Sequence, residues 1–240
     1  MEMKKILYPL CCTCFISSAL LAQQAVDTSF HTASLQHAKN VFNSASGIQS
    51  HLYNGEAYYE QRQTSEDDFP YFQTIDWTTG TIHYDGDYYE NVPILFDLTT
   101  DDVITELPRN AAKVKLVNGK ISSFTMENRT FIKLSDPKIK SGFYGLLYSG
   151  PSKVYARYEK RRQERISERT ITISFEPKTR YYILKNGNYF QVRSKGDVLK
   201  VFGDKKRELK QAAQKNHLQF NKNREQSIVK LAELYDSIQP

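Results

Sequence analysis

Three dipeptides of Asp or Asn followed by Gly divide the middle of the chain, and they constrain its fold more than any other feature. They are Asp85-Gly86, Asn118-Gly119 and Asn186-Gly187, each between runs of aromatic and β-branched residues. Such dipeptides favour two-residue hairpin turns, because both central residues of a type I′ turn need a positive φ. Gly150-Pro151 marks a fourth turn. Tight turns join antiparallel neighbours, since parallel strands need crossovers of about a dozen residues or more.

Side-chain alternation between these turns predicts strands. Val154, Ala156 and Tyr158 alternate with Arg157 and other polar neighbours, and the same pattern returns over residues 170–176. A strand directs successive side chains to opposite faces of its sheet. The pattern therefore predicts one apolar face and one solvent-facing side, with Arg157 on the latter.

Residues 52–193 contain about nine or ten such segments, which is more than a flat sheet usually holds without curling. We therefore predict an α+β fold that is mainly β. Its centre is a curved antiparallel β-meander or partial barrel, with a short amino-terminal helix and carboxy-terminal helices.

The helices are predicted from apolar spacing and caps. Residues 34–42 carry apolar side chains at helical intervals. Ser194 with Asp197 three residues later forms a capping-box pattern before a short helix that Gly203 ends. A second helix is predicted over 205–217. Asn223 can cap a third helix, whose apolar face carries Ile228, Leu231, Ala232 and Tyr235.

The first residues read as a cleavable secretory signal. Lys4 and Lys5 precede an apolar stretch that ends in small residues at Ala22, and cleavage after Ala25 is the alternative. A membrane anchor fits less well, because Pro9 and paired serines interrupt the stretch. Lipidation is also disfavoured, because few apolar residues precede the cysteines. All three cysteines lie in this segment, so a mature chain would have no disulfides: Cys11, Cys12 and Cys14.

Four segments follow from these patterns. Residues 1–22 form the signal and residues 23–51 an amino-terminal helical segment. Residues 52–193 form the antiparallel β domain, and residues 194–240 form helices that pack on the same domain. The length beyond the signal suits one domain with a sizeable core.

The chain is basic, with a formal net charge of +6. A basic cytosolic chain would suggest nucleic acid as partner, but for an exported chain anionic lipid headgroups or acidic glycans are the expected partners. The charge could also form a solvated basic face with no partner. No later stretch is apolar enough for a membrane span after signal cleavage. One basic run is expected to be an extended loop between two strands: Lys160, Arg161, Arg162, Arg165 and Arg169.

No motif for catalysis or cofactor binding is present in the sequence. It contains no Gly-x-Ser-x-Gly elbow and no phosphate-binding Gly-rich loop with Lys. The histidines do not have the i, i+4 spacing that lets two imidazoles share a zinc ion: His31, His37, His51, His83 and His217. We therefore expect no cofactor, and the sequence leans away from an enzyme.

Clusters of carboxylates leave three interpretations open. Turns use Asp because its side chain bonds nearby backbone amides. Asp85, Asp87 and Asp97 are weak candidates for a calcium site, since calcium prefers six to eight oxygen ligands. A hydrolase that uses Asp67, Asp85 or Asp97 would need two carboxyl groups within about 5 to 9 Å of each other.

Tyrosine and phenylalanine are abundant in the predicted strands, with 16 Tyr and 13 Phe in the chain. Sheets favour aromatic residues in any case. A curved sheet lined with Tyr could also hold a lipid tail or a glycan, because Tyr is apolar in body and carries a hydroxyl. The candidate ligand-lining residues are Tyr84, Tyr88, Phe96, Tyr144, Tyr148 and Tyr158.

Residues 82–97 resemble a segment of uncharacterised exported proteins of the Bacteroidota. The shared features are a Tyr-Asp-Gly turn at 84–86, the strand Tyr89-Glu90-Asn91-Val92-Pro93 and the pair Phe96-Asp97. Further similarity covers residues 52–58, 131–134, 142–150 and the closing helices. The resemblance implies a location in the periplasm or at the outer membrane, and it implies no activity and no site residues.

The sequence thus favours an exported protein of the cell envelope that acts as a non-enzymatic binding or accessory module, with an envelope protein, a lipid or a glycan as partner. One alternative is a lipid or glycan carrier that uses an aromatic-lined concave sheet. The other is a carboxylate-based hydrolase. Neither the ligand nor the oligomeric state follows from the sequence.

Overall fold

The structure is a computed structural model that describes residues 34–35, 37–38, 41–42, 51–65, 67–108 and 110–238. The predicted secretory signal lies outside these residues. The described residues between 34 and 42 are helical, as predicted, and their apolar side chains are exposed.

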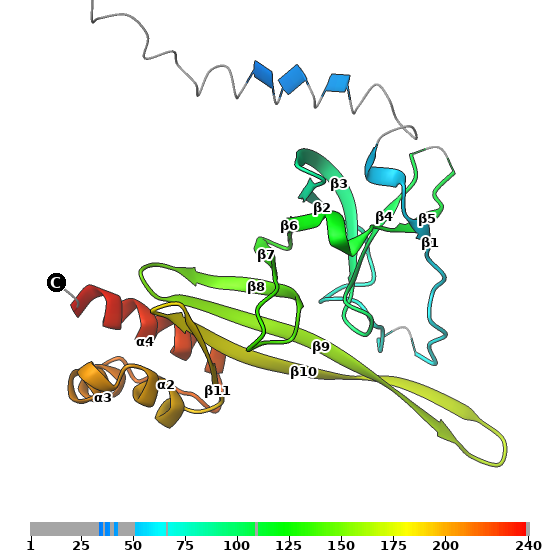
Figure 1. The fold of residues 1–240 in the computed structure, drawn as a ribbon. Helices are drawn as coiled ribbons and strands as arrows, with labels where there is room; N and C mark the ends of the chain where they lie inside the picture. The colour runs from blue at the N-terminus through cyan, green and yellow to red at the C-terminus, as the bar shows by residue number, and fades with distance from the viewer. Residues whose placement is uncertain are drawn as a thin grey trace, which may run out of the picture.

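Eleven antiparallel strands form one open sheet (Figure 1). The predicted mainly β, α+β fold is therefore confirmed, with slightly more strands than expected. In chain order the strands are β1 (Glu56–Ala57), β2 (Thr78–Tyr84), β3 (Asp87–Asp97), β4 (Asp102–Glu106), β5 (Lys113–Lys115), β6 (Ile121–Met126), β7 (Arg129–Leu134), β8 (Gly142–Ser149), β9 (Lys153–Ile166), β10 (Ile171–Lys185) and β11 (Asn188–Val192).

The sheet consists of two meanders rather than the single one predicted. Its order is β1-β5-β4-β3-β2-β6-β7-β8-β9-β10-β11, so the chain runs outward from β2 to β5 and then returns to place β6 beside β2. The 3-10 helix η3 (Asn118–Lys120) makes this return. The predicted hairpin turn at Asn118-Gly119 is thus wrong. The Asn118 amide instead donates to the carbonyl oxygen of Asp101 and to Asp102 Oδ1, at 3.0 and 2.9 Å.

The other two Asx-Gly turns are confirmed. Asp85 and Gly86 both have positive φ and join β2 to β3, and Asn186 with Gly187 does the same between β10 and β11. Gly150 lies in the turn between β8 and β9, as predicted. At these positions, turn chemistry and strand pairing agree.

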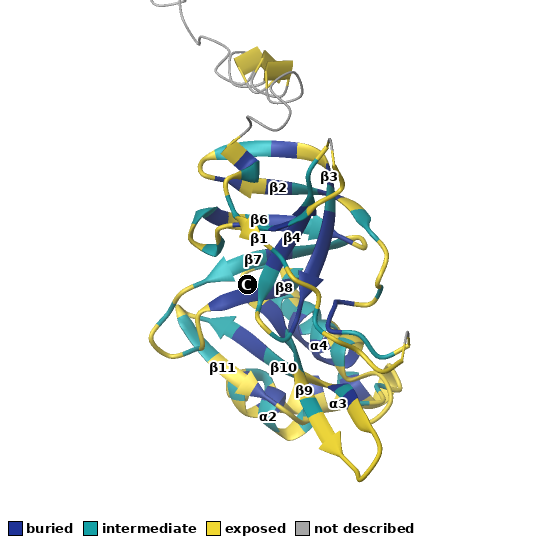
Figure 2. Cartoon of the chain, turned by 90° about the vertical axis from the view of Figure 1, so that its right-hand side faces the viewer, coloured by how far each residue is buried: buried dark blue, intermediate teal, exposed yellow. Residues whose placement is uncertain are grey.

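Phenylalanine side chains fill the interior of the curled half of the sheet. Phe96, Phe124, Phe131 and Phe143 are each at most 1% exposed and contact one another in edge-to-face and stacked pairs. Figure 2 shows that β2, β3 and β6 each contain buried stretches. Ring centroids 4.8 to 5.9 Å apart are typical of tight aromatic packing.

The hairpin of β9 and β10 is the longest element and extends well past the body (Figure 1). Its pairing continues without a break from Leu184 opposite Lys153 to Ile171 opposite Ile166. The basic run predicted as a loop is therefore the far half of this hairpin, and only residues 167–170 turn.

The outer edge of β10 is covered by the segment before β2. Thr64 Oγ1 accepts from the amide of Ile173 at 2.7 Å, and the Asp68 carboxylate accepts from the amide of Phe175 at 3.0 Å. Pro177, two residues further on, has no N–H to leave unpaired. These three features protect an edge that could otherwise pair with another chain.

The carboxy-terminal helices pack on β8, β9 and β11. Asn223 precedes the last helix, and the predicted capping box is present, with the Ser194 side chain accepting from the amide of Asp197. The predicted apolar face from Ile228 to Tyr235 is buried in a second core with Val154 and Ile183. No helix in the described part of the chain has the length and hydropathy of a membrane-spanning segment. The helices are η2 (His51–Tyr53), α2 (Lys195–Val201), η4 (Gly203–Lys205), α3 (Lys206–Lys215) and α4 (Arg224–Ile238).

Asp204 connects this helical layer to the sheet. It accepts from Lys185 Nζ at 2.8 Å and from the Tyr235 hydroxyl at 3.0 Å. The hydrogen bond from Lys185, more than any other interaction, lowers the pKa of Asp204 from 3.8 to about 2. Because the folded-state pKa is depressed, the stabilising effect is complete above about pH 4 and is lost as the pH falls towards 2.

We expect the substitution Asp204→Asn to lower the free energy of unfolding at neutral pH, by less than about 1 kcal/mol because the carboxylate is 48% exposed. The difference from the unchanged protein should vanish near pH 2. Urea denaturation at several pH values measures it, and a difference that stays constant down to pH 2 contradicts the assignment.

Candidate functional site

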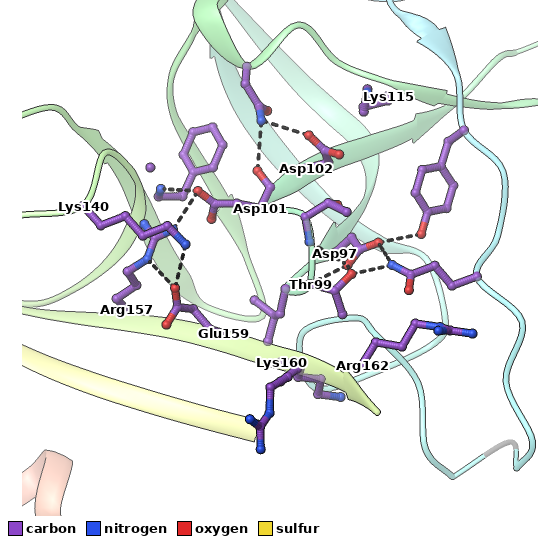
Figure 3. Close-up of a pocket in the computed structure, with 18 of the residues that line it drawn as sticks. Asp97, Thr99, Asp101, Asp102, Lys115, Lys140, Arg157, Glu159, Lys160 and Arg162 are labelled. Carbon is purple, nitrogen blue, oxygen red and sulfur yellow. Dashed lines mark hydrogen bonds and ion pairs between the residues drawn. The ribbon is translucent and has the colours of Figure 1, made fainter. Parts of the chain in front are cut away.

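A groove of about 1150 Å³ lies where the curled half of the sheet meets the base of the β9–β10 hairpin. Its walls come from residues 56–61, from the turn between β3 and β4, from the loop before β8, and from β9 and β10 (Figure 3). Distant parts of the sequence thus meet in one site. The turn carries the carboxylates Asp97, Asp101 and Asp102, and the hairpin supplies most of the cations.

Arg157 on β9 is the centre of the groove wall. Its side chain is only 1% exposed. Nη2 donates to Asp101 Oδ2 and Nε donates to Glu159 Oε1, both at 3.2 Å. The guanidinium Cζ lies 5.2 Å from the centroid of the Tyr144 ring. A buried charge requires such partners, because isolated ions are costly to remove from water.

Asp101 is held in place from two sides. The Phe143 amide donates to its Oδ2 at 3.3 Å, and Arg157 donates to the same oxygen. Burial nonetheless raises the pKa of Asp101 above its ordinary value, against the lowering effect of Arg157. Gly142, just before Phe143, allows this close approach: it has a φ of +145°, and a side chain there would overlap Asp101 and Arg157.

Glu159 accepts hydrogen bonds from three cationic side chains. Lys140 donates to it at 3.0 Å, and Arg157 and Arg180 donate to it as well. Burial acts to raise the pKa of Glu159, but the hydrogen bonds from Lys140 and Arg157 outweigh burial and the pKa lies below its ordinary value. Figure 3 shows Arg157, Lys140 and Glu159 together on one side of the groove. This carboxylate is therefore a fixed anion that orders the surrounding cations.

Asp97 forms a second fixed point on the opposite side. It is fully buried and accepts from the Tyr58 hydroxyl at 2.8 Å, from Gln61 Nε2 at 3.0 Å and from the Thr99 amide at 2.8 Å. Burial, together with this carboxylate, raises the pKa of Tyr58. Asp97 thus anchors the segment 56–61 across the sheet and fixes the rim of the groove.

The charge that remains in the groove is positive. Its lining has nine Lys and Arg against five Asp and Glu. All five carboxylates have donors within the protein. Those of Asp97, Asp101 and Glu159 are described above. Asp102 accepts a hydrogen bond from the Asn118 amide, and Glu56 forms an ion pair with Lys115. Three of the cations, by contrast, have no carboxylate within 4 Å among the described residues: Lys133, Lys160 and Lys178.

These three lysines are available to a ligand to different degrees. Lys133 donates to the Asn118 carbonyl, and Lys160 donates to the Phe69 carbonyl at 2.6 Å. Burial lowers the pKa of Lys160. Lys178 is exposed on β10. At the rim, Tyr59 is 85% exposed, so an aromatic ring lies open beside the cations. The groove can therefore hold an anionic ligand that also offers an apolar face.

The predicted carboxylate sites do not assemble. Among the residues that the structure describes, no three His, Asp or Glu side chains are grouped so that they could hold a metal ion. Asp85 pairs with Lys120 at 2.7 Å and Asp97 is enclosed by hydrogen-bond donors. The calcium candidates Asp85, Asp87 and Asp97 are therefore not brought together. Of the hydrolase candidates, only Asp97 lines the groove.

The aromatic candidates lie mostly in the interior. Tyr84, Phe96 and Tyr144 are at most 1% exposed, and Phe96 belongs to the phenylalanine core. Tyr158 is partly buried, and its hydroxyl donates to Glu225 on α4 at 2.7 Å. The Tyr88 ring lies 4.6 Å from the His83 ring in a tilted arrangement, and Tyr148 packs beside the helices. None of these six residues is among the groove lining.

Sequence patterns missed the residue at the centre of the groove. Alternation placed Arg157 on a solvent-facing side, yet it is the most deeply buried cation of the lining. The available signal was its position inside the short apolar run Val154–Tyr158, with Glu159 two residues later on the same face.

Comparison of the chain with protein-family models, curated proteins and solved structures finds no match.

Proposed function

We propose that this protein is a non-enzymatic binding module of the cell envelope whose groove binds an acidic glycan. The observation that carries the proposal is the charge arrangement of the groove: its carboxylates are satisfied within the protein, whereas Lys133, Lys160 and Lys178 have no carboxylate partner among the described residues. An anion supplied by a ligand completes them.

The surroundings of these cations favour a sugar. Tyr59 offers an open ring on which the apolar face of a sugar can pack, and the exposed Thr100 offers a hydroxyl group. A lipid tail would need a continuous apolar surface, but three of the predicted aromatic residues, Tyr84, Phe96 and Tyr144, are packed into the core. The amino-terminal pattern and the resemblance to exported proteins support a periplasmic or outer-membrane location.

Binding accounts for this groove better than proton transfer does. Each of its carboxylates is engaged by donors: Glu159 is fixed by three cations, and Asp97 accepts from five donor groups of Tyr58, Gln61, Thr99 and Thr100. A general acid or base needs access to its substrate. Carboxylates held in this way order the cations instead of reacting.

The test is titration of the protein with an oligogalacturonate, with an uncharged galactan oligomer as the matched probe. We expect the double substitution Lys133→Gln with Lys178→Gln to weaken binding of the oligogalacturonate about tenfold or more, because two ligand-facing charges are lost. Tyr59→Ala should weaken it further, since the sugar loses its stacking surface.

The control removes the same charge from a remote, exposed face by Lys200→Gln with Lys210→Gln. This variant should bind as the unchanged protein does. Equal losses in both double variants would assign the affinity to net charge alone. If the neutral galactan bound as tightly as the oligogalacturonate, the proposal that the groove recognises an acidic group would be wrong.

A further inference from the structure

The tip of the β9–β10 hairpin is a second surface that the groove does not use. Every residue from 164 to 172 is exposed, and Figure 2 shows the far end of the hairpin as a continuous exposed stretch. In Figure 1 the tip lies beyond the rest of the described structure. A convex projection of this kind contacts surfaces rather than enclosing ligands.

An apolar stripe emerges at this tip. Ile171, Ile173 and Phe175 lie on one side of β10. Ile173 and Phe175 are 3% exposed, and their backbone amides donate to Thr64 and Asp68, whereas Ile171 is 41% exposed. Ile171 pairs across the strands with Ile166, which is 77% exposed. Two isoleucines thus share one exposed face at the outermost pair of the ladder.

Arginines flank this isoleucine pair in the sequence. Residues 161–176 contain four Arg against three Glu, while Lys160 and Lys178 belong to the groove. Two of the glutamates are already paired, Glu176 with Arg161 and Glu164 with Arg162. Arg165 and Arg169 have no carboxylate within 4 Å among the described residues, and Glu168 is the acidic residue that remains at the tip. The tip therefore carries an exposed isoleucine pair, with Arg165 on the opposite face of the hairpin, and its unpaired side chains add two positive charges against one negative charge.

We propose that this tip docks on the surface of an anionic lipid bilayer. Ile166 and Ile171 enter the interface, and Arg165 and Arg169 contact acidic headgroups. A protein partner would need a pocket shaped to the isoleucines, whereas a deformable lipid surface accepts a convex apolar tip, and anionic lipids attract the arginines. This docking is independent of the proposed glycan groove, and it would hold the groove close to the membrane.

The experiment places a tryptophan at the tip of the full chain and uses brominated lipids as contact quenchers. With vesicles of brominated phosphatidylglycerol, we expect Ile166→Trp to show a blue shift and strong quenching relative to the unchanged chain, whose Trp77 gives the background. With brominated phosphatidylcholine, neither change should occur. Arg165→Gln combined with Arg169→Gln should weaken partition into the phosphatidylglycerol vesicles about 30-fold.

The matched control is Phe190→Trp, which replaces another exposed apolar residue on β11 and should stay unquenched. Both tryptophan variants carry the amino-terminal segment. A difference in quenching between them therefore reports contact by the tip and not membrane attachment through that segment. Absence of quenching at position 166, or equal quenching at 166 and 190, overturns the proposal. If the tryptophan emission shifted to the blue with rising protein concentration in the absence of vesicles, the isoleucine pair would instead be a contact between two copies of the chain.

Discussion

Replacing Arg157 by methionine is expected to lower the free energy of unfolding by about 3 to 5 kcal/mol, which is typical of removing one partner from a buried ion pair. Methionine fills much of the same volume, so the loss comes from the charges and not from a cavity. Asp101 would be left with the Phe143 amide as its remaining donor in that network, and Glu159 would lose one of its three cations.

Arg161→Met is the matched control, on the same strand and the same face. Its side chain is 74% exposed and its ion pair with Glu176 is solvated. Exposed pairs contribute little, so this variant should unfold within about 0.5 kcal/mol of the unchanged protein. Urea denaturation followed by circular dichroism compares the two. Similar effects from both substitutions would show that Arg157 does not organise the groove.

Two further measurements isolate the buried charge as the cause. Adding Asp101→Asn to Arg157→Met should restore part of the lost stability, because it removes the carboxylate left without a cation. Burial already raises the pKa of Asp101 above its unfolded value, so protonation favours the folded state. The destabilisation caused by Arg157→Met should therefore shrink as the pH falls through the pKa of Asp101.

The burial of Arg157 also explains why sequence patterns did not find the groove. Alternation assumes that one face of a strand is solvated. On β9, however, Val154 faces the carboxy-terminal helices, while Tyr155 packs on the other face with Tyr144 and Tyr182. Both faces are covered at this point. Local sequence cannot reveal such coverage, because the covering elements lie far away in the chain.

Turns show the same division between local and distant causes. Asp85-Gly86 and Asn186-Gly187 form the predicted hairpins because their flanking strands pair with each other. Asn118-Gly119 has the same local chemistry, but its flanking strands pair with other partners, and the Asn118 side chain bonds to the β3–β4 turn. The fold class, the capped helices and most hairpins therefore followed from the sequence, whereas the return connection did not.

The candidate site depended most on distant contacts. Aromatic residues were correctly expected in the strands. Whether they line a cleft or fill a core depends on how far the sheet curls, and Phe96 with Phe131 shows that it curls enough to bury them. The basic run was found from its charge but misplaced in a loop, because nothing local signals a hairpin with fourteen paired positions.

Substituting Gly142 by alanine is the second change with a large expected effect, a loss of about 3 kcal/mol or more of unfolding free energy. Its φ of +145° is a conformation that residues with a side chain rarely adopt. The added methyl group would also overlap Asp101 Oδ2 and both terminal nitrogens of Arg157. Strain and the displaced ion pair therefore act together.

Gly119→Ala provides the control, because Gly119 has open space around the position of a side chain and no positive φ. It should change stability by no more than about 0.5 kcal/mol. Combined with Arg157→Met, Gly142→Ala should cost less than the sum of the two single changes, because a flexible methionine can yield to the methyl group. Full additivity would mean that backbone strain alone makes glycine necessary, and that Gly142 does not shape the pocket around the buried arginine.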